Sequence, residues 1–495
     1  MFPESPRVQL GPLRGELSGN QTFVFIDLMA KDGHEKGPAR TQKRCTVKIS
    51  YLKKPLMLSS LSEKICFAVK INHQGESTMA VVNNILDRLL GLEKTNFTVT
   101  DVKTSAEQTV WRVEHKESPE YICPRCGAVH TSAFSKEWIK LNDTPWGFAK
   151  SIWYVKRARI LCTCSLNPIV ERMDFRSKHH QMTQRFVDYI EMTLCTKMFT
   201  VADVSRLFGV SYSVAYKIDH EVLLRLIQSH EIPDPINLSV DETSFRKRHK
   251  YVTVVTDADR SQVIWVSEGN RKESLDQFFK VLGPDRCIKI KTVARDLHIP
   301  YQASCNEYVP QALQVADPFH VVQRLNQSID DCRKELSVGS ALRVGKRKLI
   351  NRMNWLLRFK QVNLSKEQHK SLESLKKVND SLYSAYLLKE YFYQFFLYKP
   401  NQIKEAEEFL IHWIVEAFKI NLNGLQSFAN YIKNNTGQLL NIIQTGRSSA
   451  ISEGINSKIS VIKKMAYGYK NIQYFMLKIM QRCGTLGKNW QPAAL

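Results

Sequence analysis

Three acidic residues in this chain have the type and the placement for metal-ion chemistry. Asp241 follows an apolar, strand-like run at 236–240. Asp296 follows a similar run at 288–294, one arginine later, and Glu453 opens a Lys-rich, helix-like segment. Carboxylates at the ends of neighbouring strands, joined by one from a helix, supply the oxygen ligands that hard divalent cations take. Two such cations can stabilise both oxygens of an in-line phosphoryl displacement.

The charge balance indicates which phosphate is involved. Lys and Arg together number 71 against 48 Asp and Glu, which gives a formal net charge of +23. A solvated basic surface is one explanation. A surplus this large more often means a polyanionic partner, because each neutralised phosphate releases counterions. We therefore expect a nucleic-acid backbone, although charge alone separates neither DNA from RNA nor either from an anionic membrane.

The composition limits the class of protein. The 495 residues are 43% hydrophobic, which is typical of a globular chain with several cores. No run reaches the roughly 18 to 20 apolar residues that span a bilayer, so no membrane partner is expected. The N-terminus has no apolar segment of a secretory signal. The 11 cysteines, two close pairs and scattered singles, favour a reducing cytosol and a metal site over disulfides.

The elements that must position the acids predict a mixed sheet. Strands are predicted at 236–240, 251–256, 263–266, 288–294 and 313–316, with helices at 274–282 and 301–308. Three adjoining strands followed by helix–strand alternation are the order of a ribonuclease-H-like core, an α/β fold whose mixed sheet is flanked by helices. From 321 to about 444 the pattern is helical throughout, which predicts a large all-α insertion. The last helical segment then returns Glu453 to the core.

A second candidate metal site precedes the sheet. Residues 95–175 read as short strands and hold two close pairs of cysteines: Cys123 and Cys126, and Cys162 and Cys164. Four thiolates satisfy a closed tetrahedral Zn²⁺ site. His130 or His179 could replace one ligand, although a lone histidine is more often a solvated or core residue. We therefore predict a small zinc-binding β module.

Residues 183–230 are predicted to be helical and to include a helix-turn-helix. Thr200 caps a first helix, Gly209 lies at the turn, and Ser211 caps a second helix. The polar face of that second helix, which could enter a major groove, carries Tyr212, Ser213, Tyr216 and Lys217. An ordinary helical hairpin is the alternative.

The start of the all-α region is strongly basic. Between Arg333 and Lys360 there are nine basic residues, and Glu335 is the only acid. Such a face could simply be solvated. Beside a metal site it more plausibly follows a DNA backbone. The cluster that we assign to DNA is Lys346, Arg347 and Lys348.

Taken with these elements, three stretches resemble bacterial insertion-sequence transposases of the ISL-three family, which have a DDE catalytic core. They read SVDETSF at 239–245, ADPFHV at 316–321, and EGINSKI at 453–459 continuing to AYGY at 466–469. The resemblance runs from Met79 almost to the C-terminus. Residues 1–78 have no counterpart in the family, and they read either as upstream translation or as a small separate domain.

The resemblance implies roles for individual residues. Asp241 and Asp296 would be the strand-borne catalytic acids and Glu453 the helical one. The family has an Asp-or-Cys-x-x-His element beyond its second aspartate, and Asp317 and His320 fit that element as supporting residues. Two features depart from the family. The second cysteine pair is spaced more tightly than usual, and Arg295 beside a catalytic acid is uncommon.

The resemblance also implies the activity. Asp241 would bridge two Mg²⁺ (or Mn²⁺) ions, and Asp296 and Glu453 would each bind one, for cleavage and joining of double-stranded DNA. The zinc module and the helix-turn-helix would read terminal inverted repeats, the basic helices would hold flanking or target DNA, and the protein would act as a homo-oligomer on DNA in the bacterial cytoplasm, at the nucleoid. The alternatives are a sequence-specific DNA-binding protein without enzymatic activity, including an inactive transposase, and a structure-selective nuclease.

The predicted organisation has six parts. They are an N-terminal extension (1–78), a helix with the zinc module (79–180), the helix-turn-helix domain (181–232), the first part of the catalytic core (233–329), the basic all-helical insertion (330–445) and the C-terminal part of the core (446–495).

Overall fold

The computed structural model describes most of the chain after residue 77. The described residues are strands β1 (Phe23–Asp27) and β2 (Lys48–Leu52) and residues 78–147, 149–246, 250–338, 348, 350–446 and 450–492. The predictions for the rest of residues 1–77 and for Lys346 and Arg347 therefore lie outside the described residues. The chain divides into two compact units, Met1–Tyr189 with Ala494–Leu495, and Ile190–Ala493. Each unit is described by itself.

The first unit is built on a mixed sheet, in which β4 and β8 run parallel and the other neighbouring strands run antiparallel. Its strand order is β3-β4-β8-β7, with β9 beside β8, and β5 and β6 form a separate two-stranded ladder. The elements are α1 (Thr78–Leu90), β3 (Phe97–Thr104), β4 (Gln108–His115), β5 (Tyr121–Ile122), β6 (Val129–His130), β7 (Ser135–Trp146), β8 (Ala149–Ile160) and β9 (Ile169–Val170). Alternate residues of β8, among them Trp153 and Val155, are fully buried. This period of two holds over 151–155 and gives the sheet one face on the core, and the buried positions then shift to Ala158 and Ile160.

Three helices follow, and the caps of the last two are those predicted. They are α2 (Gln184–Cys195), α3 (Val201–Phe208) and α4 (Tyr212–Gln228). Thr200 and Asp203 form a capping box at the start of α3, because each side chain accepts from the backbone of the other residue. Gly209 ends α3 with a φ of 65°, a left-handed conformation that glycine adopts without strain. The hydroxyl of Ser211 then accepts from the N–H of Val214 and caps α4.

The second unit contains a five-stranded mixed sheet of order β12-β11-β10-β13-β14. β10, β11 and β12 are antiparallel neighbours, whereas β10, β13 and β14 run parallel. The strands are β10 (Asn237–Arg246), β11 (Lys250–Asp257), β12 (Gln262–Glu268), β13 (Thr292–Arg295) and β14 (Leu313–Ala316). The helices between them are α5 (Lys272–Leu282), α6 (Pro284–Cys287) and α7 (Ile299–Tyr308).

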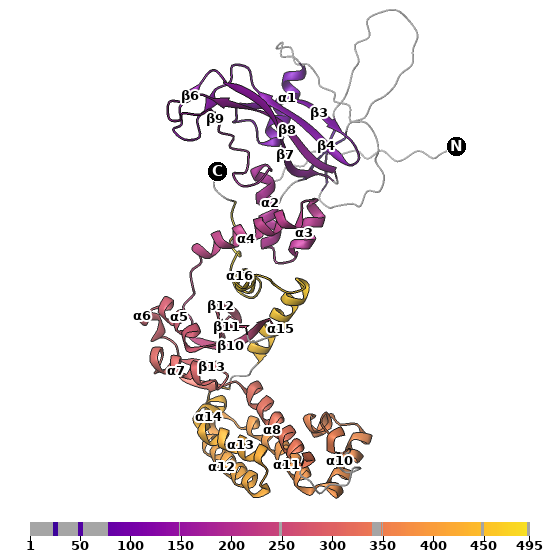
Figure 1. The fold of residues 1–495 in the computed structure, drawn as a ribbon, viewed down its shortest axis with the longest axis vertical. Coiled ribbons are helices and arrows are strands. Elements are labelled where there is room, and N and C mark those ends of the chain that lie inside the picture. Colours follow the sequence, from indigo (N-terminus) through magenta and orange to yellow (C-terminus); the bar gives the residue numbers. More distant parts are fainter. Residues whose placement is uncertain are drawn as a thin grey trace, which may run out of the picture. The chain divides into compact units, whose positions relative to one another are not determined.

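Helices cover both faces of this sheet (Figure 1). Leu238 and Val240 of β10 pack with α5 and α7 in one core. Val252 and Val254 of β11 pack in a second core on the opposite face, together with α4, α15 (Ala450–Met465) and α16 (Ile472–Cys483). Because side chains alternate along a strand, Ser239 and Asp241 of β10 face the side that α15 covers.

Two strand predictions needed correction. The strand predicted at 288–294 begins only at Thr292, because Pro284 starts the short helix α6 and residues 288–290 turn out of it. β10 does not end before Asp241 but continues to Arg246, where it forms a hairpin with β11. The other predicted strands and helices of this sheet are confirmed within about two residues, which is the usual uncertainty of element ends.

The all-α region packs around its own aromatic core. Its elements are α8 (Pro318–Val338), η1 (Leu356–Arg358), η2 (Gln361–Asn363), α10 (Lys366–Val378), α11 (Asp380–Phe392), η3 (Tyr393–Leu397), η4 (Pro400–Gln402), α12 (Ile403–Ile420), α13 (Asn423–Asn434) and α14 (Thr436–Thr445). Phe392, Phe395, Trp413 and Phe428 lie at the centre of that core. Among the described residues, no helix has both the length and the apolar character to cross a bilayer.

Candidate active site

A row of aspartates crosses the parallel half of the mixed sheet. Val240 of β10 pairs with Arg295 of β13, and Arg295 pairs in turn with Ala316 of β14. The next residue on each of these three strands is an aspartate: Asp241, Asp296 and Asp317. β13 and β14 end at this row, so the carboxylates lie at the carboxyl edge of the sheet, where parallel strands commonly present functional groups.

Asp241 is held by groups from two elements. Its Oδ1 accepts a hydrogen bond of 2.7 Å from the N–H of Glu242, and its Oδ2 accepts one from the side-chain amide of Asn456 on α15. The hydroxyls of Ser239 and Ser452 hydrogen-bond at 2.7 Å one turn away, which ties the start of α15 to β10. The side chain of Asp241 is 12% exposed, so it is fixed and still reachable from one side.

His320 lies between two of the aspartates. Its Nε2 is 3.5 Å from Oδ1 of Asp241, and its Nδ1 is 3.9 Å from Oδ2 of Asp296. Burial by itself lowers the pKa of His320, but the hydrogen bond to Asp241 and the charges of Asp296 and Asp317 outweigh it and raise the pKa to about 9. The imidazolium therefore balances part of the negative charge that the carboxylates bring together.

Asp317 is the most enclosed member of the row. Its Oδ1 accepts a 2.8 Å hydrogen bond from the N–H of Phe319 at the start of α8, which orients the turn carrying His320. Burial raises the pKa of Asp317 to about 6, against the effect of that hydrogen bond, and the neighbouring charges of Asp241 and Asp296 act in the same direction as burial. The positive charge of His320 acts against this rise and favours the ionised form of Asp317.

The described residues gather one oxygen- and nitrogen-donor group here. Asp241, Asp317 and His320 offer ligand atoms that all lie within 4.8 Å of one another. Asp296 borders this group through His320, and its side chain is 39% exposed. Glu453 is exposed in the first turn of α15, between Ser452 and Asn456, and is not part of the group. The donors present fit hard divalent cations, which take carboxylate oxygens first.

Arg295, whose position beside an acid departs from the family pattern, has a structural explanation. Its side chain is 1% exposed. Its Nε donates to Oε1 of Gln314 on β14 at 3.2 Å, and its Nη1 donates to the carbonyl oxygen of Asp296 at 2.9 Å. Burial lowers the pKa of this guanidinium. Arg295 thus cross-links β13 to β14 and fixes the backbone of Asp296, without entering the donor group.

A polar cavity of about 400 Å³ adjoins the row of aspartates. Asp296 and His320 stand at one end, and the cavity continues along the exposed face of α8 toward α13. Arg324, one turn beyond His320 on α8, places its guanidinium 4.3 Å from the ring centroid of Tyr431 on α13. An arginine held over an aromatic ring can still offer N–H groups to a phosphate.

The predicted cysteine site is assembled in the first unit. The Sγ atoms of Cys123, Cys126, Cys162 and Cys164 all lie within 4.8 Å of one another. Two cross pairs, Cys123 with Cys164 and Cys126 with Cys162, are 3.5 Å apart. A tetrahedron with Zn–S bonds of about 2.3 Å has sulfur–sulfur edges of about 3.8 Å, so the spacing fits Zn²⁺. The tight Cys162-Thr-Cys164 spacing is compatible with that tetrahedron. Neither His130 nor His179 belongs to the group.

The surroundings shift the pKa values of Cys123 and Cys164 in opposite directions. The backbone N–H of Cys126 is the largest cause that lowers the pKa of Cys123, to about 6. The side chain of Cys162, followed by burial, raises the pKa of Cys164 to about 12. The thiolate form is thus favoured at Cys123 and disfavoured at Cys126 and Cys164.

The residues that we assign to DNA binding differ in their exposure. On α4, Tyr212, Ser213 and Lys217 are exposed. The ring of Tyr216 instead packs edge-on against Tyr474 of α16, with centroids 4.7 Å apart. In the basic stretch, Lys348 is exposed, whereas Arg333 is buried and bonded to Asp330.

Asn456 is the site residue that the sequence did not single out. It lies three residues after Glu453, and positions three apart share one helix face. That spacing within EGINSKI was the available signal. The spacing could not reveal that Asn456 binds Asp241, because the two residues are 215 positions apart in the chain.

Known proteins resemble the second unit and much of the rest of the chain. A family model described as Transposase matches residues 238–479. The transposase for insertion sequence element IS1001 of Bordetella parapertussis is 28% identical over 361 residues, which are 72% of this chain and 87% of that protein. The transposase for insertion sequence element IS1557 of Mycobacterium tuberculosis is 24% identical over 420 residues, which are 78% of this chain and 91% of that protein.

Proposed function

Because the chain belongs to the ISL-three family of DDE transposases of insertion sequences, we propose that it binds the terminal inverted repeats of its element, cleaves the DNA there and joins the ends to target DNA. The row of aspartates at 241, 296 and 317 carries this proposal, because it concentrates carboxylates at one sheet edge. The strand order β12-β11-β10-β13-β14, with helices on both faces, supports a ribonuclease-H-like core.

The residues that would hold two Mg²⁺ or Mn²⁺ ions are Asp241, Asp296 and Glu453. When bound, the two ions would activate the attacking oxygen and stabilise the leaving one. Other residues of the protein position these carboxylates and balance their charge. Asn456 and the N–H of Glu242 fix both oxygens of Asp241. His320 balances charge between Asp241 and Asp296, and Arg295 fixes the backbone of Asp296.

Asp296 and Asp317 are both candidates for the second catalytic acid, and the exposure of their side chains distinguishes them. Asp317 is 5% exposed and accepts the N–H of Phe319, so it is committed to the turn that carries His320. The side chain of Asp296 is 39% exposed and faces the neighbouring cavity. We assign the catalytic role to Asp296 and a supporting role to Asp317 and His320.

The DNA contacts follow the exposed cations. Arg324 beside the aspartates is placed for a backbone phosphate of the reacting strand. Lys348, with Lys346 and Arg347, would hold flanking or target DNA. The zinc module of the first unit and the N-terminal end of α4 would read the repeats. Two ends must be brought together, so we propose a homo-oligomer on DNA.

The test is strand cleavage and joining on a duplex that carries the element's terminal repeat, with Mg²⁺ or Mn²⁺. Asp241→Ala, Asp296→Ala and Glu453→Ala should each lose at least about 1,000-fold in rate, since metal-held charge stabilisation contributes several kcal/mol. Asp285→Ala is the control, because Asp285 is an exposed acid on α6, outside the row. Repeat-specific binding without any cleavage by the wild type would favour the DNA-binding alternative. Cutting of branched DNA without joining would favour a nuclease.

The assignment of Asp296 over Asp317 has its own test. A cysteine ligand prefers softer ions, so Asp296→Cys should be inactive with Mg²⁺ and partly active with Mn²⁺. Asp317→Cys should show no such change of metal preference. Metal-selective rescue at Asp317 alone would reverse the assignment.

A further inference from the structure

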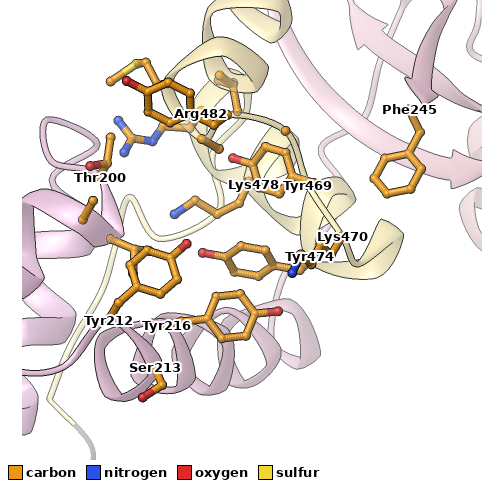
Figure 2. A pocket seen from close by; sticks show the side chains of 17 residues that line it. Thr200, Tyr212, Ser213, Tyr216, Phe245, Tyr469, Lys470, Tyr474, Lys478 and Arg482 are labelled. Atoms are coloured by element: carbon orange, nitrogen blue, oxygen red, sulfur yellow. The ribbon is translucent and has the colours of Figure 1, made fainter. Parts of the chain in front are cut away.

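A large pocket lies away from the aspartates, between α4 and the turn that joins α15 to α16 (Figure 2). Its volume is about 860 Å³, within the roughly 300–1,000 Å³ range of ligand pockets. One wall carries Tyr212 of α4, and the opposite wall carries Tyr469. Tyr216 and Tyr474 also line the pocket and pack edge-on against each other, which joins the two walls. The AYGY motif at 466–469, which the proposed catalysis does not use, forms part of this second wall.

The walls present aromatic faces. Tyr212 and Tyr216 are stacked with centroids 6.4 Å apart and planes 16° from parallel. Tyr212 is 56% exposed, so its outer face is uncovered. Tyr467, at the tip of the turn, is completely exposed and has a φ of 51°, an unfavourable conformation for a residue with a side chain. An aromatic ring held at full exposure by a strained turn is placed for a partner.

The charges around the pocket are of one sign. Lys470, Lys478 and Arg482 line it, and none of the described lining residues is an acid. Lys478 is paired with Asp219 behind the wall at 2.9 Å, and Arg482 donates to the carbonyl oxygen of Phe199. Arg482 and Lys470 therefore provide positive charge beside the tyrosines.

The pocket is rigidly built. Asp219 of α4 is fully buried and accepts from both the hydroxyl of Tyr474 and the ammonium of Lys478 on α16. This bonded triad holds the helix-turn-helix against α16, so the two walls keep their separation without a ligand. Burial and the charge of Asp219 raise the pKa of Tyr474, which keeps its hydroxyl protonated as a donor.

We propose that this pocket binds one unpaired nucleotide of the DNA substrate, with its base against Tyr212 and Tyr469 and its phosphate at Lys470 or Arg482. This inference rests on the proposed function for its substrate. Aromatic faces beside cations bind bases that have left the duplex, because every base has a face that can stack. A base pair inside a duplex cannot enter the space between α4 and the turn that joins α15 to α16.

The position of the pocket relative to the aspartates sets where that nucleotide lies. Glu453 and Met465, which lines the pocket, are on the same helix, 12 residues apart. At about 1.5 Å per residue they are separated by about 18 Å along the axis. This equals about five base-pair steps of 3.4 Å. The unpaired nucleotide should therefore lie a few positions from the cleaved phosphate.

The test is photo-cross-linking of the full-length protein to oligothymidylate of eight nucleotides in which one thymine is replaced by 5-iodouracil. Peptide mapping should find the cross-links on Tyr212, Tyr467 or Tyr469, and unlabelled single strands should compete far better than a paired duplex of equal length. Tyr212→Ala should reduce the yield about tenfold or more, and Tyr212→Phe should retain it, since stacking needs only the ring. Tyr212 is exposed, so the alanine variant should keep the wild-type melting temperature.

Cross-links confined to other regions, or a yield that Tyr212→Ala does not change, would overturn the inference. Cleavage of repeat ends by the same preparation separates this outcome from failure of the proposed function. If the ends are cleaved and joined but the pocket is not labelled, only the pocket assignment fails. If the pocket is labelled and competed by single strands but no metal-dependent cleavage occurs, the pocket assignment is supported and the proposed function fails.

Discussion

The side-chain amide of Asn456 donates a hydrogen bond to Oδ2 of Asp241, although 215 positions separate the two residues. The bond joins the first turns of α15 to the sheet, next to the hydroxyl pair of Ser239 and Ser452. It therefore fixes both the direction of the Asp241 carboxylate and the position of the helix that carries Glu453. A residue with this role acts on catalysis through its neighbours.

Asn456→Ala should lower the rate of DNA cleavage by about 10- to 100-fold, because a hydrogen bond to a charged group contributes about 1.5–3 kcal/mol. The measurement is cleavage rate against Mn²⁺ concentration. A positioning role predicts a higher metal requirement that excess Mn²⁺ partly overcomes. Ser457→Ala is the matched control, since Ser457 is the next residue on α15 and is exposed. Equal rates for Asn456→Ala and the wild type would contradict the role.

The stability of the metal-free protein should depend on His320. Its pKa is raised above the unfolded value, to about 9, by Asp241 and the neighbouring carboxylates. The stabilisation is therefore complete below about pH 6.5 and is lost as the pH rises through about 9, by about 3 kcal/mol at most. Urea unfolding in a chelator at pH 6 and pH 9.5 measures this loss, and His320→Gln should reduce it. Mg²⁺ should also reduce the loss, because a cation replaces the imidazolium charge.

Zinc binding should require the four cysteines and neither histidine. Cys126→Ser and Cys164→Ser, both at exposed positions, should lower the zinc content of the purified protein to well below one ion per chain. His130→Ala and His179→Ala should leave it at one, because neither imidazole belongs to the thiol group. Metal analysis of the purified variants gives the answer. Full zinc content in Cys164→Ser would reopen the assignment of the fourth ligand.

Arg324 should contact a phosphate near the reacting strand. Arg324→Ala should weaken binding to repeat and random duplexes alike, and should reduce the slope of log Kobs against log salt by about 0.9. Gln327→Ala, one turn further along the same cavity wall, is the control and should leave the slope unchanged. A loss restricted to repeat DNA would instead indicate a base contact.

The fit of α13 against α8 should be sensitive to one methyl group. A Cβ on Gly424 would lie 2.3 Å from the carbonyl oxygen of Ser328, so Gly424→Ala should destabilise by about 1–3 kcal/mol. Gly437→Ala in α14 is the matched control, because a Cβ there meets nothing within 4 Å. The control should gain about 0.5–1 kcal/mol from helix propensity. Thermal unfolding of the two variants tests the contrast.

The local elements and the chemistry of the candidate residues were predictable from the order of the amino acids. The caps at Thr200 and Ser211 and the turn at Gly209 depend on contacts within a few residues, so they were predictable and are confirmed. The spacing of Cys123 and Cys126 likewise indicated that both belong to one metal site. The acid after each apolar run identified Asp241 and Asp296 as candidates, although only Asp296 follows the end of its strand and β10 continues past Asp241 to Arg246.

Which of these residues meet depends on contacts between elements that are far apart in the chain. Strand register aligned Asp317 with Asp241 and Asp296, and the packing of α15 brought Asn456 to Asp241. The packing of α16 against α4 turned Tyr216 toward Tyr474 instead of leaving its ring open to a groove. These contacts depend on hydrogen bonds and core packing between elements far apart in the chain. Periodicity and spacing reveal which face of an element is apolar, but the partner of that face is selected only when the whole core closes.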